Sequence, residues 1–158
     1  MPDDKALREE LVDLLRSGHA HATFDQAVKD FPPDKMGVRP AGSPHSAWEL
    51  LEHMRIAQND IVLFSQSADH VSPEFPDGYW PKSPGPKDPS AWKESVRALQ
   101  QDLADFEKLL RDPGRDLYTR FPWGDGQTLL REALLIADHN AYHLGQLLLV
   151  RRLVGAWE

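Results

Sequence analysis

The sequence predicts an all-α protein built as a four-helix bundle. Apolar residues recur three to four positions apart through most of the chain, which is the spacing of one helix face. No alternating run of useful length indicates a sheet. The 13 prolines are clustered and leave four long proline-free stretches. Because a proline in its interior breaks a helix, these stretches are the predicted helices: residues 3–31, 45–72, 90–112 and 123–158.

The leucine-rich pattern of the first stretch predicts one helix that continues to Phe24 and Val28 and that Gly18 kinks or divides. The second helix is expected to begin at Ser46, because Ser46 and Glu49 have the spacing of a capping box, in which each side chain binds the other's free backbone amide. Its apolar positions are Leu50, Leu51, Met54, Ala57, Ile61 and Phe64.

The third helix is expected to start at Asp88 and Pro89, since proline fits the first helical turn. The fourth begins near Thr128 and stops near Gly155. Between the second and third helices, residues 69–89 contain six prolines and two glycines. A linker of this length can cross the bundle, which makes these two helices candidates for parallel packing. Its aromatic residues are expected to lie on the bundle: Phe75, Tyr79 and Trp80.

Length and composition restrict the class of protein. The 158 residues are the size of one domain, predicted over residues 1–158. The absence of cysteine excludes disulfides, thiolate nucleophiles and cysteine-ligated metals. A net charge of −7 opposes general nucleic-acid binding. No apolar run approaches the roughly 20 residues of a membrane helix, and no signal peptide is visible. We expect a cytoplasmic protein without nucleic-acid or membrane partners.

Three of the seven histidines lie in apolar helical surroundings. His139 and His143 are four residues apart, so they lie about 40° apart around the helix and can reach one ion. His53 can face them if the second and fourth helices are neighbours. The alternative for each is a neutral, hydrogen-bonded core histidine. His45 precedes the second helix and can approach the site from the end of that helix, although a turn position is the better explanation for it.

Helical spacing also provides candidates to orient the imidazole rings or to move protons. They lie one or two turns from the histidines: Glu49, Asp60, Glu132 and Gln146. The alternative for each is a solvent-facing group or a partner at a helix end.

Several segments resemble the DinB-like (DinB/YfiT) superfamily. The segment DHNAYHLGQL, residues 138–147, is similar to the last-helix motif of that family, and SAWELLEHM, residues 46–54, to its second-helix motif. Residues 79–81 (YWP) and 127–132 (QTLLRE) are also similar to members. The resemblance spans essentially the whole chain with the same helix order.

The resemblance implies an up-down-down-up four-helix bundle with a long crossover between helices two and three. It also implies a divalent metal ion bound by His53, His139 and His143, with zinc or nickel the first choices and iron or manganese after them. Family members often form homodimers. Those with known activities include transferases and isomerases that use low-molecular-weight thiols, and many others are described as metal-dependent hydrolases.

We therefore expect an open three-histidine site in a metal-dependent enzyme, either a hydrolase or a low-molecular-weight-thiol transferase, acting on a small-molecule substrate. Without cysteine in the chain, any thiol must come from outside. The alternative is a non-catalytic metal-binding or stress-response interaction protein, in which His45 or a carboxylate closes the coordination sphere. A bundle whose histidines are only hydrogen-bonded in the core is a third hypothesis.

Overall fold

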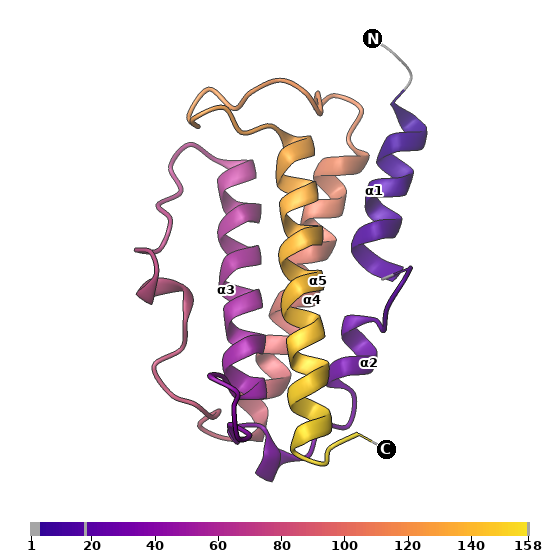
Figure 1. Cartoon of the computed structure of the whole chain (residues 1–158). Helices are drawn as coiled ribbons and strands as arrows, with labels where there is room; N and C mark the ends of the chain where they lie inside the picture. Colours follow the sequence, from indigo (N-terminus) through magenta and orange to yellow (C-terminus); the bar gives the residue numbers. More distant parts are fainter. Residues whose placement is uncertain (1–3, 18, 158) are drawn as a thin grey trace.

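A computed structural model of the chain describes residues 4–17 and 19–157, and it consists of helices joined by loops (Figure 1). The prediction of an all-α protein is confirmed: no strand occurs in the described residues. None of the helices in this part of the chain has the length and apolarity needed to cross a membrane. Residues 4–17 and 19–157 contain five α-helices and two short 3-10 helices in this order: α1 (Lys5–Ser17), α2 (Phe24–Val28), η1 (Pro33–Lys35), α3 (Ala47–Gln66), η2 (Asp77–Tyr79), α4 (Pro89–Arg111) and α5 (Leu129–Leu153).

The first proline-free stretch forms two helices, α1 and α2, in agreement with the alternative that this stretch is divided. Gly18, where a kink or division was expected, lies outside the described residues. Helix α2 has its own N-terminal cap: the Thr23 hydroxyl accepts a hydrogen bond from the Gln26 backbone amide, and the Gln26 side chain accepts one from the Thr23 backbone amide. This reciprocal cap begins α2 independently of α1.

The predicted starts of the other helices and the predicted end of the last one agree with the structure, whereas α3 ends at Gln66 and not at residue 72. Ser46 and Glu49 form the capping box at the start of α3. Asp88 accepts from the first amides of α4, whose first residue is Pro89. Thr128 accepts from the Arg131 amide at the start of α5. After α5, Gly155 has a φ of 69°, a left-handed conformation that glycine adopts without strain.

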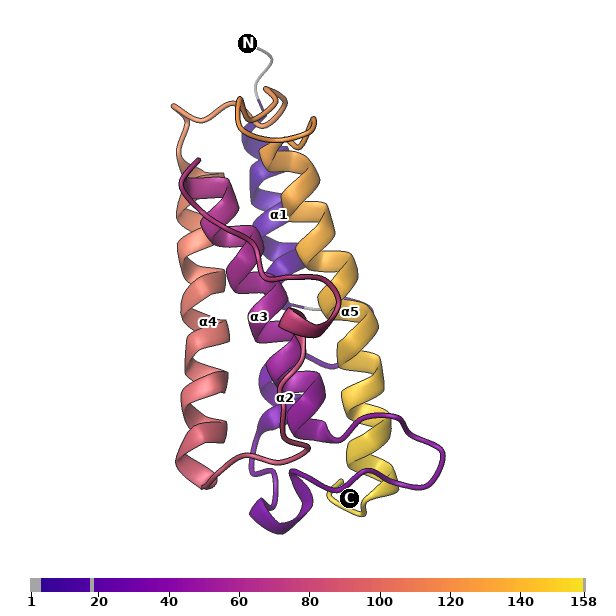
Figure 2. The same cartoon turned by 90° about the vertical axis from the view of Figure 1, so that its left-hand side faces the viewer.

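Helices α3 and α4 pack in parallel. The Ser95 hydroxyl donates to Glu52 at 2.6 Å, and further along both helices the Gln58 amide donates to the Leu99 carbonyl at 2.6 Å. Because the residue numbers of the partners rise together, the two helices run in the same direction. Figures 1 and 2 show α1 and α5 running the opposite way.

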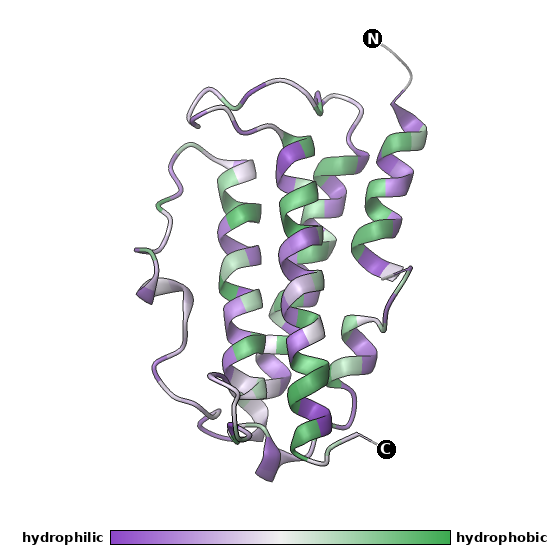
Figure 3. Cartoon of the chain, in the orientation of Figure 1, coloured by the Kyte–Doolittle hydropathy of each residue, from purple (hydrophilic) through white to green (hydrophobic). Residues whose placement is uncertain are grey.

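The apolar core consists of two clusters, one toward each end of the bundle. Helices α3, α4 and α5 contribute to both, as Leu51 and Val62, Leu99 and Phe106, and Leu147 and Ile136 illustrate. Figure 3 shows the apolar residues concentrated in the helices and the connecting loops mostly pale or hydrophilic. Because α3, α4 and α5 pack in both clusters, they connect the two ends of the bundle.

The connection from α3 to α4 returns along the outside of α3 (Figures 1 and 2). Tyr79 and Trp80 are half-buried against α3. Near its end, the Ser46 hydroxyl donates to the Pro84 carbonyl, which fastens this connection to the start of α3. Phe75 is 84% exposed, so the expectation that it lies on the bundle is wrong. Its ring contacts only the neighbouring Tyr79 ring among the described aromatic residues.

A buried guanidinium joins α1 to the end of α4. Arg8 is buried and donates to the carbonyls of Leu110 at 2.7 Å and Arg115 at 2.6 Å, and it pairs with Asp4 at 2.8 Å. Lysine cannot satisfy several carbonyls with one planar group. We expect Arg8→Lys to lower the free energy of unfolding by about 1–3 kcal/mol, measured by urea denaturation. The exposed Arg97→Lys control should change it by less than about 0.5 kcal/mol. Equal values for the two variants would contradict this role.

Candidate metal centre

The three predicted histidines lie together across α3 and α5. His53 comes from α3 and His139 and His143 from successive turns of α5. Their potential ligand atoms all lie within 4.8 Å of one another, and the Nε2 atoms of His53 and His139 are 3.0 Å apart. Two nitrogens bound to one ion at roughly 2.0–2.1 Å lie about 3–3.4 Å apart, so this pair already has nearly the separation that an ion requires.

The second nitrogen of two rings is held by a hydrogen bond. His53 Nδ1 lies 2.9 Å from the Tyr79 carbonyl oxygen, and His143 Nδ1 lies 2.7 Å from Gln146 Oε1. Both oxygens can only accept, so each Nδ1 carries the proton and donates. In the neutral rings Nε2 then keeps a free lone pair, which is the tautomer that binds a metal through Nε2. Of the four predicted orienting residues, Gln146 therefore contacts a histidine directly.

Burial keeps the three imidazoles neutral. It lowers the pKa of His139 from 6.5 to about 4, with smaller contributions from His143 and His53. Burial also lowers the pKa of His53, against the opposing effect of the Tyr79 carbonyl. It likewise lowers the pKa of His143, against the effect of Gln146. Because a metal ligand must be deprotonated, these rings are in the binding form at neutral pH.

An indole covers one side of the centre. The Trp80 ring stacks on His53 with centroids 3.9 Å apart and an interplanar angle of 1°. His45 stacks on Trp80 at 4.1 Å and 15°, and Tyr142 meets His143 edge-on at 4.9 Å. Sequence reasoning did not place Trp80 or Tyr142 in the site. The one sequence feature that could have indicated Trp80 is the aromatic pair Tyr79–Trp80 within a proline-rich linker.

Asp60 is connected to the histidine group through Tyr79 of the linker. Its carboxylate accepts from the Tyr79 hydroxyl at 2.7 Å and contacts His70 Nε2 at 2.7 Å. Burial, followed by the hydrogen bond to Asp60, raises the pKa of Tyr79 to about 12. The phenol therefore stays protonated and anchors the residue whose carbonyl holds His53. The structure thus places Asp60 behind Tyr79 and against His70, and not against an imidazole of the three-histidine group.

The other two predicted carboxylates are engaged away from the histidines. Glu49 caps α3 at the Ser46 amide and forms a bidentate ion pair with Arg39. Glu132 is 2% exposed and pairs with Arg131. Burial raises the pKa of Glu132. Both carboxylates lie one or two turns from the histidines on similar helix faces, but Arg39 and the Ser46 amide engage Glu49 and Arg131 engages Glu132, and among the described residues neither hydrogen-bonds to an imidazole.

A pair of amides lies next to His139 in the core. Asn140 donates to Gln58 Oε1 at 2.8 Å, and Gln58 donates onward to the Leu99 carbonyl at 2.6 Å. This chain ties α5 to α3 and α4 at the level of His139. Asn140 lies within the motif at residues 138–147, but its neighbours in sequence do not identify its partner on α3.

The donor set fits a divalent transition metal. Three neutral imidazoles suit zinc, nickel, copper and iron, whereas calcium and magnesium require oxygen ligands. Among the described residues, the group of potential ligands contains His53, His139 and His143, with no fourth histidine or carboxylate. His45 is outside this group.

Fold and donor set together define a helical protein with a potential three-histidine metal site. Residues 7–147 match the sequence model of the DinB superfamily. The chain belongs to that superfamily, as the motifs around His53 and His139 indicated. Comparisons with curated proteins and with solved structures give no match.

Gln146 offers a direct test of ring orientation. Gln146→Leu removes the acceptor for His143 Nδ1, so we expect zinc affinity to fall about 10–100-fold in competition with a chromophoric chelator. Gln146→Glu keeps an acceptor and should bind at least as tightly as the native protein. Native affinity in the leucine variant would show that the contact does not orient a ligand.

The pKa of His139 predicts a pH dependence for the metal-free protein. We expect its ring resonances to titrate near pH 4 in NMR spectra, identified by their loss in His139→Ala. The unfolded state then binds more protons than the folded state between pH 6.5 and about 4, so the free energy of unfolding falls as the pH drops through this range. A titration midpoint of the His139 resonances near pH 6.5 would contradict this prediction, because it would mean that water reaches the ring.

Proposed function

We propose that the chain is a metal-dependent enzyme that holds one divalent ion with His53, His139 and His143 and binds a small-molecule substrate at an open coordination position. The main support is the donor set: three neutral imidazoles and no fourth protein ligand among the described residues. Structural zinc sites are usually closed by four protein ligands, whereas three ligands with one open position are typical of catalytic sites.

Zinc or nickel is the proposed ion, with iron or manganese as alternatives. A bound divalent ion supplies Lewis-acid chemistry by lowering the pKa of a coordinated water or thiol. The first case gives a hydrolase and the second a transferase of low-molecular-weight thiols. The chain has no cysteine, so a transferase must take its thiol from solution.

The protein's own groups orient and shield the ligands. The Tyr79 carbonyl and Gln146 hold the His53 and His143 rings with Nε2 directed into the group. The Trp80 indole excludes water from one face of His53. An open site with fixed rings loses little entropy when a substrate atom approaches, which favours catalysis over storage of the ion.

The non-catalytic alternative required a fourth protein ligand such as His45. The His45 ring instead stacks on Trp80, and His45 is absent from the ligand group. This observation favours the enzyme over a closed metal-binding module.

We further propose the up-down-down-up topology and a single domain over residues 1–158, located in the cytoplasm. The parallel register of α3 and α4 supports the topology. We also propose a homodimer. Its support is the outer face of α5, which exposes four large apolar side chains: Leu134, Tyr142, Leu149 and Leu153. Burying such a face against a second copy removes apolar surface from water.

Metal content tests the proposed ligands. We expect tag-free protein to contain about one divalent ion per chain by mass spectrometry, and His139→Ala to lose it. His19→Ala is the matched control, because His19 is exposed and pairs with Asp13 outside the site. Equal metal content in the native protein and His139→Ala would overturn the ligand assignment.

Activity of the loaded protein then separates the two reactions. Hydrolysis of p-nitrophenyl esters and conjugation of glutathione to an aryl halide are assayed with the same preparation. We expect one activity in the native protein and none above background in His139→Ala. The non-catalytic alternative would be supported if the fully loaded protein had neither activity and its bound metal had no exchangeable water ligand.

A further inference from the structure

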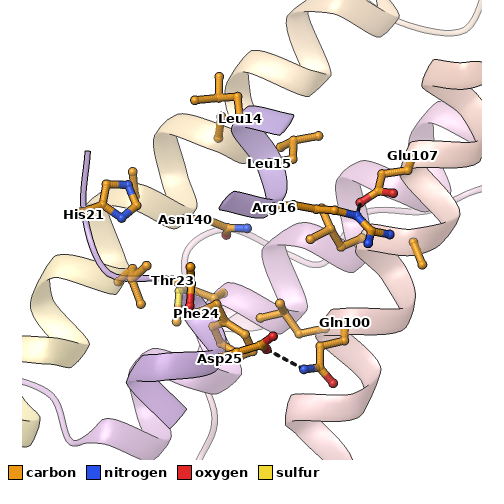
Figure 4. Close-up of a pocket in the computed structure, with 17 residues that line it drawn as sticks. Leu14, Leu15, Arg16, His21, Thr23, Phe24, Asp25, Gln100, Glu107 and Asn140 are labelled. Carbon is orange, nitrogen blue, oxygen red and sulfur yellow. Dashed lines mark hydrogen bonds and ion pairs between the residues drawn. The ribbon is translucent and has the colours of Figure 1, made fainter. Parts of the chain in front are cut away.

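A cavity of about 400 Å³ lies inside the bundle, apart from the metal centre. Helices α1, α2, α4 and α5 surround it, and Figure 4 shows the side chains that line it. On α5 it is lined by Asn140 and, further around the helix, by three apolar residues: Ala137, Ala141 and Leu144. At 100° per residue, these three positions lie on nearly the opposite side of α5 from His139 and His143. One helix therefore presents two separate sites.

The cavity has an identifiable origin. The wall formed by the N-terminal segment is interrupted, because α1 ends at Ser17 and α2 starts only at Phe24. The helices opposite this interruption contribute small side chains, namely Ala104, Ala137 and Ala141. A continuous first helix with larger residues opposite it would fill the space. The volume of the cavity lies within the range of about 300–1,000 Å³ that is typical of small-molecule sites.

Most of the lining is apolar, and the polar groups are Asn140 on α5 and side chains at the edge. The apolar lining includes Leu15, Phe24, Met54, Leu99, Leu103 and Leu144. At one edge Arg16 donates to Glu107, so these two charges neutralise each other. At another, the Asp25 carboxylate accepts from the Gln100 amide at 2.7 Å (Figure 4). In the described part of the chain Asp25 makes no ion pair.

We propose that this cavity binds a small primary amine with an apolar tail. The tail replaces water against the apolar lining, and the ammonium group lies at the edge beside Asp25. An anionic head is disfavoured there, because Arg16 is already paired with Glu107 and the remaining formal charge is that of Asp25. This proposal does not depend on the metal centre and goes beyond the proposed function.

Methionine provides a local probe. The sequence has three methionines, of which Met54 lines the cavity and Met36 lies outside it. In protein labelled with ¹³C-methyl methionine, n-octylamine should shift the Met54 signal and leave Met36 unchanged. The titration is repeated in His139→Ala with a chelator present, so that an amine bound to metal cannot produce the shift. The same shift in both proteins is expected.

The ligand class is tested with octylamine, octan-1-ol and octanoate. Octylamine should bind most tightly, and shortening its tail should weaken binding about fourfold per methylene. Asp25→Asn should weaken octylamine about 2–5-fold and leave octan-1-ol unchanged. Octanoate binding as tightly as octylamine would overturn the proposed charge preference.

Filling the cavity tests its location. Ala137→Leu should reduce octylamine affinity at least 10-fold, and Ala104→Leu provides a second variant if the first does not fold. Gly145→Ala is the control on the same helix, because an added Cβ there meets no atom within 4 Å. An unmoved Met54 signal at millimolar octylamine, or unchanged binding in a folded filled variant, would overturn the proposal.

Discussion

The burial of three imidazoles between α3 and α5 is the constraint on which the rest of the structure depends. An unsatisfied buried polar group costs about 1–3 kcal/mol, and each ring has two nitrogens. The Tyr79 carbonyl and Gln146 satisfy one nitrogen of His53 and one of His143. The remaining nitrogens converge on one another, which is stable when they share a proton or an ion.

The linker between α3 and α4 is part of the site because of the direction of these helices. Parallel neighbours require the chain to return along the bundle. This return brings the Tyr79 carbonyl to His53 and the Trp80 ring onto it. Asp60 then secures the linker through the Tyr79 hydroxyl. The connection therefore also forms a wall of the candidate centre.

Helix α5 is apolar around most of its circumference because it has different neighbours on different sides. Its imidazole face meets α3 and the linker, another face borders the cavity, and a third exposes Leu149 and Leu153. An amphipathic helix with one buried stripe could not serve these roles together. The consequence is one helix that connects a metal centre, a separate cavity and a potential dimer surface.

Sequence alone determined the features that depend on neighbouring residues: helix starts at Ser46, Asp88 and Thr128, and the shared face of His139 and His143. These follow from capping and helical periodicity, which act within a few residues. Helical spacing also identified Gln146 as a candidate, and His53 was a candidate on the condition that its helix is a neighbour of the last one. Tertiary structure decided what depends on distant partners. The apolar spacing of the first stretch also matches one continuous helix, so the sequence left open whether this stretch is kinked or divided, and the structure has two helices there.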